Sequence, residues 1–278
     1  MNINDLTCVQ NIGDIYIKRD DFFDFFGVCG GKARSALQLI QNGISNGYKS
    51  FCTAGSRMSP QCEIVSFICE QFKVECHLFM PQGFNTSVIN NISKNKKSFI
   101  HRTKVGYNSV LMHDAKNYAM NNNCFYIPFG MECEENIEVT KHQVCNIPKD
   151  VKRIVVPCGS GMSMISIIKG LDYYKMYDKV VIGVIVGKNP KKTFARFIHN
   201  DLFDKCKINY KFVKSHYNYH DSAKQNVLCG IELDPIYEAK CIPFLEKDDL
   251  LWIVGHRKFG MLTDLQENPI ATNILANR

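Results

Sequence analysis

Short apolar runs alternate with longer amphipathic segments along most of this chain. The expected strands are residues 48–53, 75–80, 98–102, 124–127, 151–156, 179–186 and 250–254, and the expected helices are residues 60–72, 85–93, 107–120 and 163–174. Strands that are separated by helices need crossover connections, and such strands pair in parallel. The pattern therefore predicts an α/β fold with parallel-rich, twisted sheets flanked by helices.

Composition places the chain among ordinary globular proteins. Hydrophobic residues make up 45% and charged residues 22% of its 278 residues, which is not the composition of a disordered chain. No apolar run reaches the length of a membrane span, and the polar start Met1–Asp5 lacks the features of a signal peptide. We therefore expect a cytoplasmic protein with no membrane partner.

Thirteen cysteines raise the question of disulfides, metal or nucleophilic catalysis. Their number is odd and no C-x-x-C pair occurs, although Cys62, Cys69 and Cys76 recur every seven residues. In a long chain without an export signal, cysteines are mostly small buried hydrophobes, so no metal site is predicted. Cys29 and Cys158 adjoin glycine-rich segments and are alternative nucleophiles.

The formal net charge of +7 favours anionic ligands. Phosphorylated substrates and nucleic acid both fit such a charge. No nucleic-acid-binding motif is visible, so a nucleic-acid partner rests on charge alone.

The segment around Lys32 is the strongest candidate for chemistry. A β-rich run from Ile15 ends in the charged cluster Lys18-Arg19-Asp20-Asp21, and Gly30-Gly31 then precede Lys32 at the start of an expected helix over residues 33–40. A helix start supplies free N–H groups and a positive dipole end, which disfavours the ammonium form of a nearby amine. Lys32 is thus a candidate Schiff-base nucleophile, and a solvated lysine on a surface turn is the alternative.

A second glycine-rich turn follows the strand expected over residues 151–156. In Pro157-Cys-Gly-Ser-Gly-Met-Ser163 the backbone N–H groups can converge on an anion at the start of a helix. A tight turn that only packs strand against helix would look similar.

Together these segments resemble the fold type II pyridoxal-phosphate enzymes of the tryptophan synthase β-like superfamily. The branch they resemble is the aminocyclopropane-carboxylate deaminase and D-cysteine desulfhydrase group. Its strand with K-R-E/D-D, its G-G-N-K-T-R-K-like segment and its G-S-G-G-T cup match residues 18–21, 30–34 and 159–163 in order. The loop Thr53–Gln61 and the segment Asp234-Pro-Ile-Tyr-Glu-Ala-Lys240 also resemble segments of this family.

The resemblance implies a two-lobed architecture and a homodimer. Residues 1–39 and 131–278 would form the larger, cofactor-binding lobe, and residues 40–130 the smaller one. The active site would lie in the cleft between them.

The resemblance also implies roles for particular residues. Lys32 would carry pyridoxal 5'-phosphate through a Schiff base and act as general base, assisted in proton transfer by Ser59 and Tyr237. Gln61 would face the substrate. The cup for the cofactor's phosphate would comprise Gly159, Ser160, Gly161, Met162 through its amide, and Ser163.

Several residues depart from the family pattern or add to it. Pro60 replaces the asparagine expected beside the cofactor ring, which argues against the deaminase activity itself. Arg57 could bind a substrate carboxylate or phosphate, or be an exposed loop residue. Tyr107 is a further substrate-side candidate, although helix packing explains it equally. His256, after the last strand, is the candidate for the wall near the pyridine nitrogen.

The sequence thus predicts an enzyme acting at the α- or β-carbon of an amino acid or an anionic amino-acid-like molecule, as a lyase, deaminase or isomerase. One alternative keeps the cofactor but takes a larger anionic substrate, such as an amino-acid-modified nucleotide or nucleic acid. Another is a non-catalytic binding protein that retains the fold.

Overall fold

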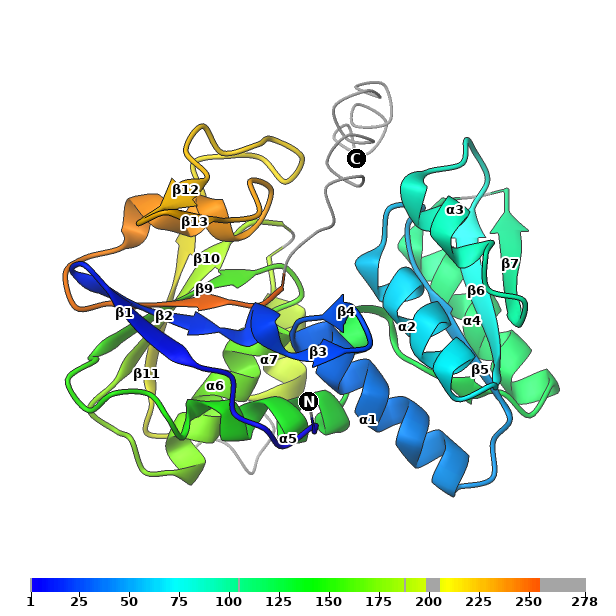
Figure 1. Cartoon of the computed structure of the whole chain (residues 1–278), viewed down its shortest axis with the longest axis horizontal. Coiled ribbons are helices and arrows are strands. Elements are labelled where there is room, and N and C mark those ends of the chain that lie inside the picture. The colour runs from blue at the N-terminus through cyan, green and yellow to red at the C-terminus, as the bar shows by residue number, and fades with distance from the viewer. Residues whose placement is uncertain (1, 105, 188, 199–205, 256–278) are drawn as a thin grey trace. The chain divides into compact units, whose positions relative to one another are not determined.

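The computed structural model describes residues 2–104, 106–187, 189–198 and 206–255. These residues form two compact units (Figure 1). The first unit combines residues 2–35 with the described residues of 132–255, and the second comprises residues 36–131. None of the described helices has the length and apolar character needed to cross a membrane.

A six-stranded sheet organises the first unit, in the order β1-β2-β14-β9-β10-β11. Its strands are β1 (Val9–Ile12), β2 (Ile15–Arg19), β14 (Leu250–Ile253), β9 (Arg153–Cys158), β10 (Val180–Ile185) and β11 (Asn209–Lys214). Only β1 runs antiparallel to its neighbour, as one arm of a hairpin with β2. Because the other five strands run in parallel, their carboxyl ends lie along one edge of the sheet.

Smaller elements surround this sheet. The helices are α5 (Glu134–Lys141), α6 (Met162–Tyr173) and α7 (Lys191–Phe197), with the 3-10 segments η1 (Asp20–Phe22), η3 (His142–Val144) and η4 (Glu238–Phe244). Two short hairpins pair β3 (Asp24–Phe25) with β4 (Val28–Cys29), and β12 (Val227–Leu228) with β13 (Ile231–Glu232). Helix α1 (Gly31–Ser45) begins in the first unit, and its residues from Ala36 on belong to the second.

Both faces of the first sheet are buried. Along β9, Ile154 and Val156 belong to a core shared with α5, α6 and α7, whereas Val155 belongs to the opposite core with η4. On β14, Trp252 and Leu251 alternate in the same way. Covering both faces explains why these strands read as continuous apolar runs in the sequence.

The second unit contains a four-stranded parallel sheet in the order β7-β6-β5-β8. Its elements are β5 (Ser50–Ala54), α2 (Pro60–Gln71), β6 (Glu75–Pro81), α3 (Ser87–Ile92), β7 (Ser98–Thr103), α4 (Asn108–Asn121), β8 (Phe125–Tyr126) and η2 (Phe129–Met131). Helix α4 packs Leu111 and Ala115 against Cys52 and Phe79 of the sheet.

The predicted α/β class with parallel-rich sheets is confirmed. Element boundaries differ from the sequence expectation by a few residues; for example, the helix expected over 33–40 begins at Gly31 and continues to Ser45. Ser59 and Pro60 take the expected N-cap and first-turn positions of α2. The structure pairs none of the thirteen cysteines in a disulfide and buries Cys62, Cys69 and Cys76.

Candidate active site

Lys32 lies in the first turn of α1, at the carboxyl edge of the first sheet. The backbone N–H of Gly31 donates to the carbonyl of Val254, just after β14, at 3.0 Å. A Cβ built on Gly30, whose φ is +92°, would lie 3.0 Å from the Cα of Gly255. Only glycine combines this left-handed conformation with so close a backbone approach. The loop is thereby fixed to the end of β14, with the Lys32 side chain exposed.

A buried ion pair between Arg34 and Asp20 lies next to the loop that carries Lys32. Arg34 Nη2 lies 2.7 Å from Asp20 Oδ1, and both side chains are inaccessible to solvent. The Arg34 guanidinium also stacks over Phe23, but Nε and Nη1 find no acceptor among the described residues. Asp20 further approaches Gly31, where a Cβ would meet its Oδ2 at 2.9 Å. Among the described residues, Asp20 is thus the one acid paired with Arg34, and it also contacts the segment of residues 30–32 (the lysine loop).

Lys18 is the second lysine of this region, and it is fully buried. Its Nζ donates to the carbonyl of Thr7 at 2.7 Å and to Asn146 Oδ1 at 2.8 Å. Burial lowers the pKa of Lys18 to about 8, an effect that nearby Asp20 opposes. Lys18, Asp20 and Asp21 of the charged cluster are thus buried, whereas Lys32 is exposed.

The glycine turn after β9 forms the start of α6. Gly161 is the N-cap residue with φ +91°, and no side chain caps the helix. The hydroxyls of Ser160 and Ser163, both half-buried, form no hydrogen bond with described residues. The first N–H groups of a helix lack partners within it, so this end can receive an anion. The side chain of Met162 packs into the core and leaves only its backbone at the turn.

Tyr237 reaches this turn from the segment before η4. A Cβ on Gly159 would collide with Tyr237 Oη, so the phenol lies directly against the Gly159 backbone. Gly187, which follows β10, is also close, since its Cβ would lie 3.9 Å from the Gly159 Cα. The structure therefore brings Tyr237 and the predicted phosphate cup together.

The sequence did not single out Glu238, but its carboxyl group is buried in the first unit. Its Oε1 accepts from the backbone N–H groups of Val254 and Gly255 at 3.2 and 3.3 Å. Its Oε2 is buried and has no hydrogen-bond partner among the described residues. Burial, reinforced by the charge of Asp234, raises the pKa of Glu238 well above its ordinary value. The only sequence signal was its position next to Tyr237.

The contact between Gly159 and Tyr237 gives a direct prediction. Gly159→Ala is expected to push the Tyr237 phenol off the turn, an overpacking change that costs about 1–3 kcal/mol and so weakens cofactor binding on the order of tenfold. The dissociation constant, followed by cofactor absorbance, measures the effect. Adding Tyr237→Phe removes the colliding oxygen and should restore part of the affinity; an unchanged constant in Gly159→Ala alone would contradict this contact.

Four predicted site residues belong to the second unit. Ser59 is the N-cap of α2, and its hydroxyl neither caps the helix nor bonds to another described residue. Gln61 is buried, and its Nε2 donates to Thr53 Oγ1 at 2.9 Å and to the carbonyl of Pro128 at 2.8 Å. Both amide hydrogens of Gln61 are thus used to join the ends of β5 and β8, and a substrate role for this residue stays a prediction.

Arg57 and Tyr107 complete this group. Arg57 donates to the carbonyl of Phe84 and stacks on its ring. Tyr107 is the N-cap of α4, and 49% of its surface is exposed. His256 lies outside the described residues, so its predicted place near the pyridine nitrogen stays a prediction. Cys158 is fully buried with a raised pKa, whereas Cys29 is exposed and donates to Asp24 at 3.1 Å.

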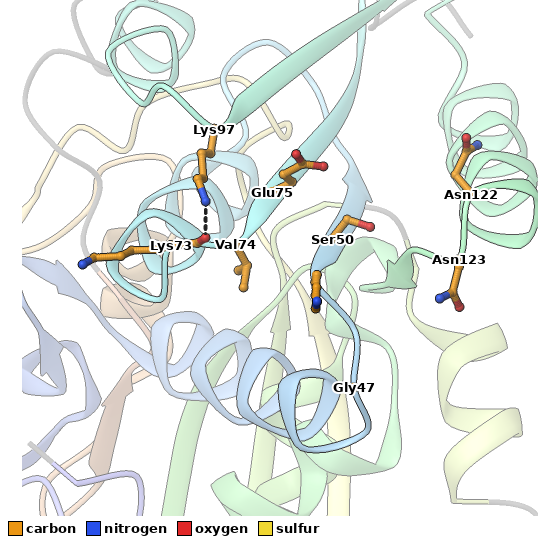
Figure 2. A pocket seen from close by; sticks show the side chains of 9 residues that line it. Gly47, Ser50, Lys73, Val74, Glu75, Lys97, Asn122 and Asn123 are labelled. Atoms are coloured by element: carbon orange, nitrogen blue, oxygen red, sulfur yellow. Dashed lines mark hydrogen bonds between the residues drawn. The ribbon is translucent and has the colours of Figure 1, made fainter.

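A cavity of about 690 Å³ lies at the edge of the second sheet where its strands begin, which is the edge opposite their carboxyl ends (Figure 2). Three lysines line it, Lys49, Lys73 and Lys97, and Lys97 Nζ donates to the carbonyl of Lys73 at 2.5 Å. Helices α2 and α4 end here, and cations complement the negative ends of helices. These lysines are thus explained by the fold, and this cavity is not the candidate active site.

The first unit therefore offers three features at the carboxyl ends of adjacent strands. They are an exposed amine on a fixed loop, a glycine turn without a side-chain cap, and a buried acid with one oxygen that has no partner among the described residues. These features fit an aldehyde cofactor that carries a phosphate and a ring nitrogen.

Solved structures share this architecture. The chain resembles an ACC deaminase homologue with a TM-score of 0.74 and 19% identity, over 92% of this chain and 90% of that one. It also resembles maize serine racemase, with a TM-score of 0.67 and 12% identity over 96% and 93% of the two chains. It also resembles the processed form of threonine deaminase isoform 2 from Solanum lycopersicum, with a TM-score of 0.61 and 16% identity over 91% of this chain and 82% of that one. At these identities the likeness establishes the fold.

The family assignment comes from the sequence. No curated protein sequence matches the chain significantly. The model of the family described as "Pyridoxal-phosphate dependent enzyme" matches residues 4–228, most of the chain. The predicted cofactor, pyridoxal phosphate, is confirmed at the level of the family, and the chain belongs to the pyridoxal-phosphate dependent enzymes.

Proposed function

We propose that this protein breaks or forms a bond at the α- or β-carbon of an amino acid or amino-acid-like substrate, with Lys32 carrying the cofactor. A single observation supports this most strongly: one network of contacts links the proposed cofactor residues. The backbone N–H of Gly31 donates a hydrogen bond to Val254, and the Glu238 carboxyl group accepts hydrogen bonds from Val254 and Gly255. Tyr237, next to Glu238 in the chain, lies against Gly159.

Each residue has a distinct task in this proposal. The exposed Lys32 amine attaches the cofactor and, when released, accepts or returns a proton at the substrate. The amides of residues 160–163 and the two serine hydroxyls hold the phosphate. Glu238, whose Oε2 has no partner among the described residues, would hold the ring nitrogen, and its raised pKa favours a carboxyl group that could supply a proton there. When bound, pyridoxal phosphate supplies the electron sink for bonds at the α-carbon.

The remaining predicted residues serve the substrate. Ser59, whose hydroxyl forms no hydrogen bond with the described residues, assists proton transfer together with Tyr237. Arg57 and Tyr107 are proposed contacts to polar parts of the substrate. The homodimer implied by the resemblance and the cytoplasmic location expected from the sequence composition stay predictions, and light scattering of the purified protein tests the first.

The experiment that tests the proposed function is hydrogen exchange at the substrate. The purified protein, saturated with cofactor, is incubated in deuterated water with a panel of small amino acids, and NMR follows loss of the α-proton together with any new product. We expect exchange or product with at least one amino acid, and none with Lys32→Ala. A protein that takes up no cofactor and exchanges nothing would instead be a binding protein with this fold.

A further inference from the structure

Two arginines flank the loop that follows β6 in the second unit. Arg57 comes from the loop after β5, and its Nη1 donates to the carbonyl of Phe84 at 3.2 Å. The guanidinium lies 4.1 Å from the centroid of the Phe84 ring, and a Cβ on Gly83 would collide with it. Its head group is therefore held between a ring and a glycine backbone.

Arg102 holds the same loop from the other side. It lies near the end of β7, and its Nη1 donates to the carbonyl of Pro81 at 3.3 Å, while Nη2 donates to Asn85 Oδ1 at 2.9 Å. Because β6 lies between β5 and β7, both arginines meet the Pro81–Asn85 loop at the carboxyl edge of this sheet. The charge of Arg102 also lowers the pKa of Arg57, after the larger effect of burial.

The loops at this edge contain no acidic residue to balance the two charges. Residues 55–59, 82–86 and 104–107, which follow β5, β6 and β7, include no Asp or Glu, and Glu63 in the first turn of α2 accepts from Asn91 Nδ2 at 2.9 Å. Neither arginine forms an ion pair with any residue that the structure describes. Like charges held close without a counter-charge are unfavourable, and an anion bound there would relieve them.

We propose that Arg57 and Arg102 bind an anionic group on the side chain of the substrate, a phosphoryl or carboxyl group beyond its α-carboxylate. This substrate class rests on the proposed function, since it assumes that an amino acid is the ligand. Arg57 uses only Nη1 in a hydrogen bond to the described residues, so other N–H groups of its fork remain for an oxyanion. Such charge-assisted bonds are stronger than neutral ones and favour planar, paired oxygens.

The competing explanation is that both arginines only fasten the loop. The two explanations differ in what they predict for binding. A loop fastener would affect charged and neutral ligands alike, whereas an anion site would affect only the ligand that carries the extra charge.

Calorimetric titration of the cofactor-saturated protein with O-phospho-L-serine, L-aspartate and L-serine separates them. We expect at least one of the two anionic amino acids to bind about 10 to 100 times more tightly than L-serine. Arg57→Gln and Arg102→Gln should each bring the affinity for that anionic amino acid down toward the affinity of the same variant for L-serine, so that most of the preference disappears. A preference for phosphoserine would identify the group as phosphoryl, and one for aspartate as carboxyl.

Lys97→Gln is the matched control, because it removes the same charge at the opposite edge of the same sheet. It should keep the preference. Equal binding of all three amino acids, a preference that survives both arginine changes, or an equal loss in Lys97→Gln would overturn the proposal. If a glutamine variant does not fold, Arg57→Lys and Arg102→Lys keep the charge but lose the fork, and part of the preference should still disappear.

A repeat with cofactor-free protein keeps this test independent of the proposed function. If the protein took up no pyridoxal phosphate, the proposed function would fail. The arginine-dependent preference for phosphoserine or aspartate would still be measurable, and its presence or absence would still decide the anion site.

Discussion

Glu238→Gln is expected to change the stability of the cofactor-free protein and the activity of the loaded protein in opposite directions. Burial raises the pKa of Glu238 well above its ordinary value, so the folded state holds this proton to higher pH than the unfolded chain does. Above the ordinary pKa of glutamate the unfolded chain has lost this proton, so the folded state binds more protons and its stability falls as pH rises. Glutamine does not titrate, and the variant escapes this fall. The free energy of unfolding of the variant, relative to the parent protein, should therefore increase from pH 5 to pH 8.

In the cofactor-loaded enzyme, the same Glu238→Gln change should lower catalytic activity. Glutamine still accepts from Val254 and Gly255, but it brings no acidic proton to the ring nitrogen. Losing one preorganised electrostatic contact of this kind lowers kcat on the order of 10²-fold. Glu232→Gln, an exposed change in the same unit, is the control and should alter neither quantity. Equal activity of Glu238→Gln and the parent protein would show that this acid does not serve the cofactor.

Asp20→Asn is expected to destabilise the first unit by about 3–5 kcal/mol, because it leaves Arg34 buried without its counter-charge. The Arg34 side chain is inaccessible to solvent, and its remaining nitrogens find no acceptor among the described residues, so the charge cannot be satisfied locally. Denaturant unfolding of the cofactor-free protein measures the loss.

Asp178→Asn makes the same chemical change in the exposed pair between Lys152 and Asp178. Exposed pairs contribute about 0–1 kcal/mol, so this control should unfold almost as the parent does. Combining Asp20→Asn with Arg34→Met removes both charges and should recover part of the stability. Similar losses in Asp20→Asn and Asp178→Asn would mean that the buried pair does not support the lysine loop.

The fold was largely predictable because its signals are local. Apolar runs such as residues 151–156 follow from burial on both faces, and Ser59-Pro60 marks a helix start in the sequence itself. The insertion of β14 between β2 and β9 is not a local property. No periodicity reveals which distant strands pair, so the contact between Gly30 and Gly255 had to come from the structure.

The candidate site divides in the same way. Lys32 and the turn at Gly159–Ser163 were recognisable because glycines at fixed positions leave a sequence pattern. Glu238 was not, since its importance lies in how its carboxyl group is placed. Its Oε1 accepts from Val254 and Gly255, sixteen and seventeen residues away, and its Oε2 has no partner among the described residues. Arg102 likewise reads as an ordinary strand residue until the Pro81–Asn85 loop is placed against it.

Covalent labelling of the lysine tests the central claim most directly. The cofactor-loaded protein is reduced with borohydride, digested, and its peptides are mapped by mass spectrometry. Lys18 is the strongest competing amine, since its pKa is lowered to about 8, but it is buried and bonded to Thr7 and Asn146. We predict that the label is found on Lys32 and is lost in Lys32→Ala. A label on Lys18 or another lysine, with uptake unchanged in Lys32→Ala, would contradict the account.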